Sequence, residues 1–193
     1  MNMKEKINLD LDKRTWHPSP LAGQIVLVTT LNPDGISNIA PKSWISMMAF
    51  EPPVLAMGCN FRHWTARNIL TNGEFVVNVP GVELIDTIWQ SYRLPHPRPV
   101  EATGLTPISA IKVKPPRVYE CKAHLECVLD QHIAYGDEVI LLGRIAAVSV
   151  DKSAGARADA YAEMRMVFFL EATTYGVIEQ ARHLEVNRLS PEK

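Results

Sequence analysis

The sequence predicts a mainly β protein, built as a closed or nearly closed barrel with short peripheral helices. Many short runs are rich in valine and isoleucine and are bounded by glycine, proline or asparagine, which is typical of strands. Helical periodicity is confined to a few short segments, and no repeat or low-complexity tract interrupts the chain. Its 193 residues fit one domain. We therefore interpret residues 1–193 as a single domain, with an N-terminal arm at about 1–17 and a C-terminal extension at about 152–193.

The strands expected in the first half of the chain follow one another closely. A turn is expected at residues 32–35, because Pro33 presets a backbone angle and Gly35 closes the turn. Pro52 and Pro53 stop a later run. The expected strands are Gln24–Thr30, Ile36–Ala40, Ser43–Phe50, Val54–Cys59 and Glu74–Val79.

Two longer strands are expected in the second half. Over Tyr119–Val128, apolar residues alternate with glutamate, lysine and histidine, which predicts one buried face and one wet face. The residues expected inside are Tyr119, Cys121, Ala123, Leu125 and Cys127. The second strand is Glu138–Val150, and Gly143 within it indicates a bulge or a bend.

Three short helices are expected. Thr65–Thr71 has Thr65 at the N-cap position and an Asn-Gly stop at residues 72–73. Val82–Trp89 carries apolar residues at helical spacing, and Ala158–Met166 is rich in helix-forming residues.

A long connection, Tyr92–Pro107, separates the second helix from the next strand. It contains four of the 14 prolines, and a loop of this length inside a compact domain commonly serves as a lid or a binding loop. Arg93, His96 and Arg98 are the side chains in it that suit a substrate lid.

Composition and charge exclude several classes of protein. Hydrophobic residues make up 47% and charged residues 21%, which argues against a disordered protein. The net charge of −1 argues against a protein that binds duplex nucleic acid. No apolar run is long enough to span a membrane, and the charged N-terminus does not resemble a signal peptide, so we expect a cytoplasmic protein. The histidines are scattered and the cysteines lack zinc spacing, so no metal site is expected. Cys59, Cys121 and Cys127 are expected to be core residues.

Polar residues interrupt the apolar strands at three places between residues 29 and 78. In Asn38–Trp44, small and hydrogen-bonding residues suit the close approach of a flat ligand, and the alternative is a bulged strand with its polar side chains in water. In Asn60–Thr65, a helix N-terminus with Arg62 suits a phosphate group, and the alternative is a plain N-cap beside a solvated arginine. Asn78 is a third candidate, and its alternative is an amide bonded to neighbouring backbone.

Taken together, these residues resemble the flavin reductase-like family of FMN-binding split barrels, which includes flavoredoxin. The resemblance covers about residues 18–150. It is carried by the ordered set Asn38, Ala40, Pro41, Ser43, Trp44, Pro52, Pro53, Arg62, Thr65, Asn68, Ile69, Gly73, Glu74, Phe75, Asn78, Glu101, Gly104, Leu105 and Pro116.

The resemblance implies a six-stranded Greek-key split β-barrel that forms a homodimer, with one FMN per subunit near the interface. By position, residues 38–43 line the ribityl chain and the isoalloxazine edge, and Arg62 and Thr65 hold the phosphate. Lys42 is our candidate partner for the flavin N1–C2=O edge, and Trp64 or Trp89 could cover the ring. The candidate cofactor-binding residues are Asn38, Ala40, Pro41, Lys42, Ser43, Asn60, Arg62, Thr65, Asn68 and Asn78.

The chain departs from the family at one position. Many relatives that use pyridine nucleotides carry Gly-Asp-His where this chain reads Gly136-Asp137-Glu138, and a carboxylate there would repel the phosphates of NAD(P)H. Lys42 and Glu138 are thus the candidates for a catalytic role. The resemblance implies an FMN-dependent oxidoreductase that passes electrons from NAD(P)H to an unknown acceptor. The alternatives are an electron carrier or redox-responsive module without NAD(P)H activity, and a reductase that supplies free flavin to a monooxygenase.

Overall fold

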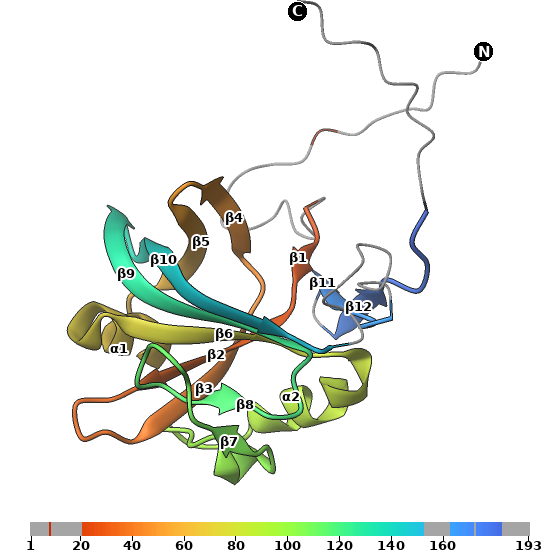
Figure 1. Cartoon of the computed structure of the whole chain (residues 1–193), viewed down its shortest axis with the longest axis horizontal. Coiled ribbons are helices and arrows are strands. Elements are labelled where there is room, and N and C mark those ends of the chain that lie inside the picture. Colours follow the sequence, from red (N-terminus) through yellow and green to blue (C-terminus); the bar gives the residue numbers. More distant parts are fainter. Residues whose placement is uncertain (1–7, 9–20, 153–162, 172, 183–193) are drawn as a thin grey trace, which may run out of the picture.

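The computed structural model describes residues 8, 21–152, 163–171 and 173–182, and Figure 1 shows a mainly β fold. An antiparallel sheet of seven strands forms most of it. In spatial order its strands are β3 (Ser37–Lys42), β2 (Val26–Leu31), β6 (Glu74–Val79), β9 (Ala123–Tyr135), β10 (Glu138–Val150), β5 (Pro53–Asn60) and β4 (Ile45–Phe50). The prediction of a mainly β split barrel with short helices is confirmed, and its large sheet has seven strands where six were expected.

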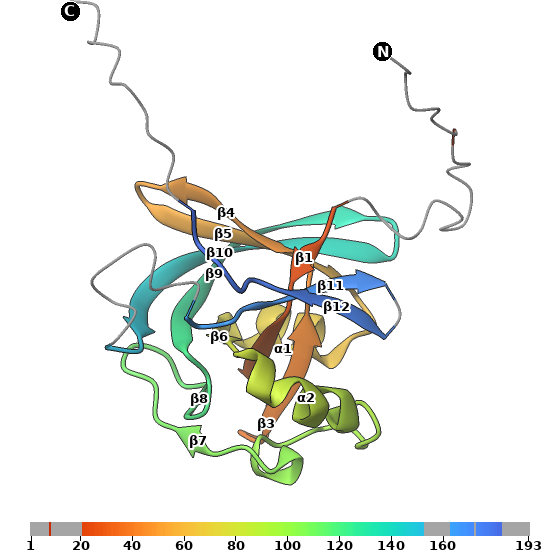
Figure 2. The ribbon, with the colours of Figure 1, turned by 90° about the vertical axis from the view of Figure 1, so that its right-hand side faces the viewer.

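The remaining elements surround this sheet. A small sheet consists of β1 (Gly23–Gln24), β11 (Val167–Glu171) and β12 (Thr174–Val177), and a second one of β7 (Pro107–Ile108) and β8 (Arg117–Val118). The helices are α1 (Trp64–Asn72), η2 (Val82–Leu84), α2 (Ile85–Ser91) and η3 (Glu101–Thr103). Figure 2 shows the β1–β11–β12 sheet crossing in front of the large sheet, with α2 near its base. None of the described helices is long and apolar enough to cross a membrane.

The split of the barrel lies between β3 and β4. These two strands are the opposite edges of the large sheet, yet they follow each other in sequence and are joined only by Ser43 and Trp44. The chain therefore crosses from one edge of the sheet to the other within two residues. The end of β3 pairs with β2 on one side, and no described strand pairs with its other side, at the gap.

A core of aliphatic side chains fills the barrel, and Phe75 is fully buried within it. The predicted irregularity at Gly143 is confirmed, because the register of β9 and β10 shifts between Leu142 and Gly143. A Cβ atom at Gly143 would lie 2.4 Å from Phe75 Cζ. The glycine thus makes room for the aromatic ring. Cys59, Cys121 and Cys127 are buried and unpaired, as expected.

The chain beyond residue 152 contributes to the core. Met164 and Val167 are buried, and β11 pairs with β1 at the start of the barrel. The predicted helix Ala158–Met166 lies largely outside the described residues, and its described end, residues 163–166, is a turn and an isolated bridge. The expected N-terminal arm also lies outside the described residues, apart from Asn8.

The first two predicted helices are present, but their N-terminal ends differ from the prediction. Thr65 was expected to cap α1, but the N-cap is His63, and Thr65 lies inside the first turn with 1% of its surface exposed. Gly73 ends the helix in the left-handed conformation (φ 73°), as predicted. The predicted helix Val82–Trp89 begins as the 3₁₀ turn η2 and continues as α2 to Ser91.

The strand expected over Tyr119–Val128 was wrong in its start and in its wet face, whereas Cys121, Ala123 and Cys127 are buried as expected. β9 begins at Ala123, and Tyr119 is 70% exposed in a turn. Glu126, assigned to the wet face, is 1% exposed. Its carboxylate accepts hydrogen bonds from the backbone N–H groups of Ile111 and Lys112. A loop packed over the strand buries this face, and alternation within the strand carries no signal of that loop.

Candidate functional site

A pocket of about 630 Å³ opens at the split between β3 and β4. Its walls come from the end of β3, the Ser43–Trp44 link, the end of β5, the start of α1, the loop after α2 and the start of β10. The lining residues are Ala40, Pro41, Lys42, Ser43, Trp44, Gly58, Cys59, Asn60, Arg62, His63, Trp64, Thr65, Tyr92, His96, Arg98 and Glu138.

Most of the predicted cofactor-binding residues meet in this pocket. Those that line it are Ala40, Pro41, Lys42, Ser43, Asn60, Arg62 and Thr65. Residues 40–43 and residues 60–65 are separated in sequence by the whole of β4 and β5. They come together because β4 and β5 are antiparallel neighbours, with Ile45 opposite Met57, so β5 returns the chain to the end of the sheet at which β4 begins.

Asn38, Asn68 and Asn78 do not line the pocket. The amides of Asn68 and Asn78 bond inside the protein, whereas Asn38 accepts hydrogen bonds through Oδ1 and its buried Nδ2 has no partner among the described residues. Asn78 Nδ2 donates to Leu27 O at 2.9 Å, and its Oδ1 accepts from Val118 N at 2.9 Å. Asn78 therefore bonds to the backbone of β2 and β8, which is the alternative kept open above. Asn68 Nδ2 donates to Thr30 Oγ1 at 2.9 Å, which joins α1 to β2.

A cluster of Lys42, His63 and Cys59 forms one wall. Lys42 Nζ donates to His63 Nδ1 at 3.3 Å, and Cys59 Sγ lies 3.6 Å from the same nitrogen. Burial lowers the pKa of Lys42, and the nearby Arg98 lowers it further, against the opposing effects of Cys59 and Glu138. Burial and then Lys42 lower the pKa of His63, and burial raises the pKa of the Cys59 thiol. The thiol is thus held in its protonated, weakly nucleophilic form.

Thr65 and Arg98 bring buried donors without partners to the pocket. Arg98 is 4% exposed, and its Nη2 donates to Leu94 O at 3.0 Å and to Tyr92 O at 3.4 Å. Arg98 Nε and Thr65 Oγ1 have no hydrogen-bond partner among the described residues. Buried polar atoms are normally satisfied, so each indicates a ligand atom that accepts hydrogen bonds. A phosphate or a carbonyl-rich ring meets this requirement.

Glu138 also lies in the pocket wall. It is the direct cross-strand neighbour of Asn60 in the β5–β10 ladder, and Asn60 Nδ2 donates to Glu138 Oε1 at 3.2 Å. Asn60 Oδ1 in turn accepts from Arg62 N at 2.9 Å. One asparagine therefore fixes both the acidic side chain and the turn that presents Arg62.

The loop Tyr92–Pro107 packs against β3 and supplies the opposite wall. Tyr92, His96 and Arg98 line the pocket, whereas Arg93 lies in a second cavity beside Trp89. Trp64 lines the main pocket and Trp89 does not.

Five lining residues were given no role of their own from the sequence: Trp44, Gly58, Cys59, His63 and Tyr92. Trp44 and His63 nevertheless lie within the predicted ligand segments 38–44 and 60–65, and Tyr92 begins the predicted binding loop. Their places in the pocket depend on the crossing of the chain from β3 to β4 and on the packing of the loop after α2.

Fold and site together define a split-barrel protein with a donor-rich ligand pocket between its edge strands. The sequence model of the flavin reductase like domain matches residues 19–169 of the chain. The chain therefore belongs to the flavin reductase-like family.

Two relatives match a large part of the chain. A protein of Archaeoglobus fulgidus is 32% identical over 110 residues, 56% of this chain and 62% of that protein. YwrF of Bacillus subtilis is 31% identical over 147 residues, 70% of each chain. The chain thus spans about two thirds of the length of these relatives.

Three solved structures share the fold. Nitrilotriacetate monooxygenase component B from Bacillus cereus has a TM-score of 0.83 at 24% identity, covering 95% of this chain and 100% of that one. Flavoredoxin of Desulfovibrio vulgaris has a TM-score of 0.79 at 21% identity, covering 94% and 99%. The FMN-binding protein from Thermus thermophilus has a TM-score of 0.75 at 15% identity, covering 94% and 100%.

Proposed function

We propose that the chain binds FMN in the pocket at the barrel split and acts as an oxidoreductase, passing electrons from NAD(P)H to a second acceptor. The observation that carries the proposal is the Thr65 hydroxyl, which is buried in the first turn of α1 beside Arg62 and has no hydrogen-bond partner in the described part of the chain. A helix N-terminus presents free N–H groups and a partial positive charge, so it suits a single phosphate group. The names of the Thermus protein and of flavoredoxin support the choice of a flavin.

Different residues of the pocket would bind different parts of the cofactor. Arg62, the Thr65 hydroxyl and the first N–H groups of α1 would hold the phosphate. Residues 40–43 of β3 and the link would lie along the remainder of the cofactor, with Lys42 as the cation for the flavin edge that gains negative charge on reduction. FMN would supply hydride acceptance and two-electron transfer, and the protein would bind and orient it.

Glu138 supports a second candidate function, that of an electron carrier without NAD(P)H activity. Its carboxylate lines the pocket, where it would oppose the phosphates of a dinucleotide. The two candidates differ only in the electron donor.

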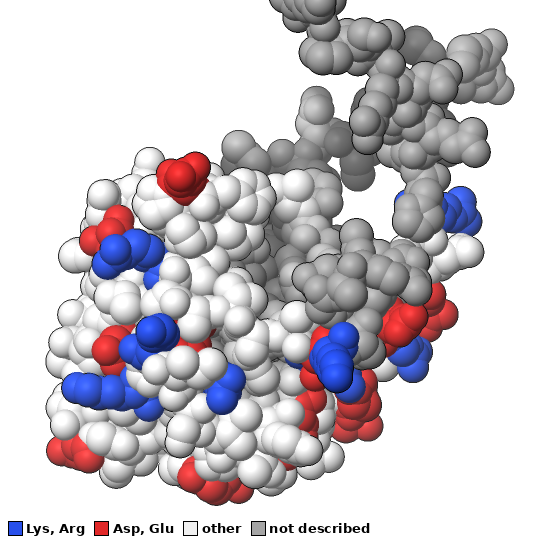
Figure 3. All heavy atoms as spheres, viewed as in Figure 1, with Lys and Arg blue, Asp and Glu red and all other residues white. Residues whose placement is uncertain are grey.

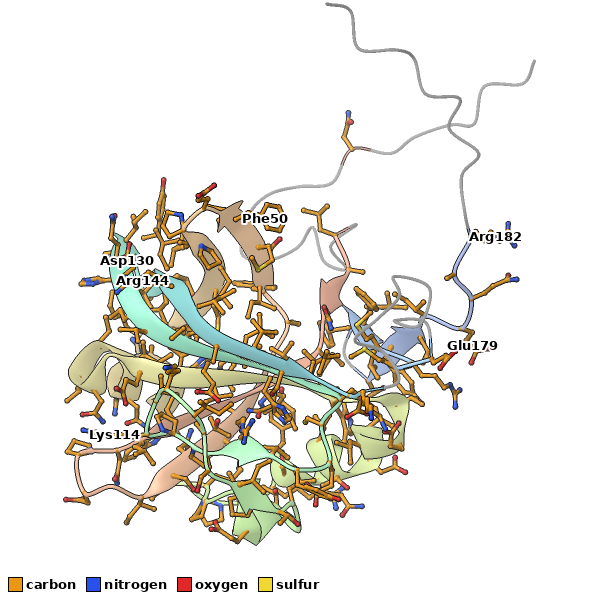
Figure 4. The ribbon with its side chains drawn as sticks, viewed as in Figure 1. Phe50, Lys114, Asp130, Arg144, Glu179 and Arg182 are labelled. Carbon is orange, nitrogen blue, oxygen red and sulfur yellow. The ribbon has the colours of Figure 1, made fainter. Side chains whose placement is uncertain are left out.

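We also propose that the protein is a homodimer. Trp44 and the exposed side chains of β4 form an apolar surface next to the pocket, with Phe50 87% exposed at the end of the strand. Figure 4 shows Phe50 at the end of β4, and Figure 3 shows that the face over β4 and β5 is mostly uncharged. Ile133 and Tyr135, on the hairpin of β9 and β10, are exposed as well. A second copy that covers this surface would also close the pocket.

Titration of the purified chain with FMN and FAD, followed by anaerobic titration with NADH and NADPH, tests the proposal. Stoichiometric FMN binding with a flavin absorbance spectrum is expected, and bleaching by a nicotinamide nucleotide identifies the enzyme. Bleaching by dithionite alone identifies the carrier. Much tighter binding of FAD than of FMN would contradict the one-phosphate site.

A further inference from the structure

His96 is fixed in the pocket wall by two neighbours, and the proposed binding of FMN assigns it no role. Its Nδ1 lies 3.0 Å from Asn38 Oδ1. Its ring stacks on Trp64, with ring centroids 6.1 Å apart and an interplanar angle of 16°. Both the plane of the imidazole and the position of one ring nitrogen are therefore set before any ligand arrives.

The hydrogen bonds at Asn38 also decide which ring nitrogen carries the proton. Arg98 N donates to Asn38 Oδ1 at 3.1 Å, and a backbone N–H can only donate. The atom bonded to both Arg98 and His96 is therefore the amide oxygen, an acceptor. It follows that His96 Nδ1 bears the hydrogen and that Nε2 holds the lone pair.

His96 Nε2 is the ring nitrogen available for proton transfer. It has no hydrogen-bond partner among the described residues, and His96 both lines the pocket and remains exposed to solvent. Nδ1 keeps its hydrogen in the neutral and in the protonated ring, so the bond to Asn38 survives either state. The imidazole can therefore gain or lose a proton at Nε2 without moving.

The charges around His96 favour its neutral form. Burial lowers the pKa of His96, and the cations Arg98 and Lys42 lower it further. His63 precedes α1, and Glu138 at the start of β10 is the carboxylate in the same pocket. A cationic surrounding of this kind makes the protonated ring a stronger acid than an ordinary imidazolium.

We propose that His96, positioned by Asn38, transfers a proton through Nε2 to a carbonyl acceptor of the quinone class while that acceptor is reduced in the pocket. The proposal rests on the proposed function, because the reduced cofactor is the electron source. The aromatic side chains Trp44, Trp64 and Tyr92 suit a planar ring, and Arg98 Nε, which has no hydrogen-bond partner among the described residues, suits one of its oxygens.

The proposed step balances in electrons and protons. Reduction of a quinone to a hydroquinone needs two electrons and two protons. When bound and reduced, FMN would supply both electrons and one proton, as a hydride. The second proton comes from protonated His96, whose Nε2–H bond breaks as the O–H bond of the hydroquinone forms. Neutral His96 then recovers a proton from water, which its exposure permits.

The test compares two acceptors of different proton demand in a stopped-flow instrument. The FMN-loaded chain is reduced with dithionite, so that NAD(P)H use is not required. It is then mixed with menadione, which takes up protons, or with ferricyanide, which takes an electron alone. Wild type is compared with His96→Gln and with His132→Gln, a control at an exposed histidine of β9 outside the pocket.

We expect His96→Gln to slow menadione reduction about 100-fold, the low end for general acid catalysis, and to leave ferricyanide reduction within about twofold. In wild type the menadione rate should rise as pH falls through the pKa of His96. Asn38→Asp still accepts hydrogen bonds from His96 and Arg98, and it places a negative charge beside the imidazole. The pH at which the menadione rate rises should therefore move to a higher value. His132→Gln should change neither rate.

Two results would overturn the role of His96 without affecting the proposed binding of FMN. One is equal slowing of both acceptors in His96→Gln, and the other is a menadione pH profile that Asn38→Asp leaves unmoved. Failure of the wild-type chain to bind FMN at all would instead overturn the proposed function, and this proposal with it.

Discussion

Asn60 and Glu138 face each other across the β5–β10 ladder, and the Asn60 amide donates to the Glu138 carboxylate at 3.2 Å. This pairing holds an acidic side chain in the wall of a pocket whose other charged groups include Lys42, Arg62 and Arg98. Under the proposed function, this carboxylate would oppose an anionic electron donor, while the cations around it would favour an anionic cofactor.

Removing the charge of Glu138 should accelerate reduction by NADH. A like-charge repulsion of about 1–3 kcal/mol corresponds to roughly a five- to hundredfold loss of dinucleotide affinity. Glu138→His should therefore raise the rate of flavin reduction at subsaturating NADH, with FMN affinity unchanged. Glu138→Gln keeps an oxygen for Asn60 and separates the effect of charge from that of the histidine. Stopped-flow rates equal to wild type in both variants would show that Glu138 does not control donor binding.

Loss of Arg62 should weaken FMN binding and leave the fold intact. A hydrogen bond to a charged group contributes about 1.5–3 kcal/mol, so the Kd of Arg62→Ala should rise by roughly ten- to hundredfold. Arg67→Ala is the matched control, since Arg67 is exposed on α1, the helix that follows Arg62, and does not line the pocket. Fluorescence titration of each apoprotein with FMN measures the Kd of both variants. An unchanged Kd in Arg62→Ala would leave this arginine as a solvated surface charge.

Thr65→Val should separate ligand binding from stability. Valine matches the shape of threonine and removes a buried hydroxyl that has no partner among the described residues, a group that costs about 1–3 kcal/mol. The thermal midpoint of the apoprotein should therefore stay level or rise, while the Kd for FMN increases. Calorimetry and titration of the same sample test both statements. A large drop in the apoprotein midpoint would indicate that the hydroxyl has a structural partner.

Gly143→Ala should destabilise the barrel because the added Cβ would lie 2.4 Å from Phe75 Cζ. Overpacking of a buried site costs about 1–3 kcal/mol. The cost should be smaller when Phe75 is replaced by leucine, so urea unfolding of Gly143→Ala, Phe75→Leu and the double variant forms a closed cycle. Strict additivity of the two changes would contradict a direct clash.

Phe50→Asp should shift the protein from dimer to monomer. The ring is 87% exposed at the end of β4, and a charge there opposes burial in an interface. Sedimentation velocity at micromolar concentration is the measurement. Ile111→Asp is the control, because Ile111 is exposed on a loop remote in sequence from β4 and from the β9–β10 hairpin. A wild-type sedimentation coefficient of a 21.6 kDa monomer would contradict the dimer at once.

Local patterns predicted much of the fold. Valine-rich runs bounded by turn residues gave β6 and β10 with their observed bounds, and Gly73 and Gly143 marked a helix end and a bulge. These features depend on short-range backbone preferences, which the chain carries residue by residue. Tyr119 and Glu126 were assigned to the wrong environments, because their burial depends on a distant turn and a covering loop.

The sequence by itself determined the β-rich class, the helix that follows Arg62 and the set of polar residues near the ends of β3 and β5. Only the tertiary structure decided which of them share a pocket. Asn68 and Asn78 turn inward to bond β2, while the Thr65 hydroxyl, expected to cap a helix, is buried and has no partner within the described ranges. His96 reaches the site because one amide oxygen, on Asn38, accepts hydrogen bonds from two residues of a loop about 60 positions away. Such bonds join segments distant in sequence, so their partners are fixed only when the sheet closes and the loop packs against it.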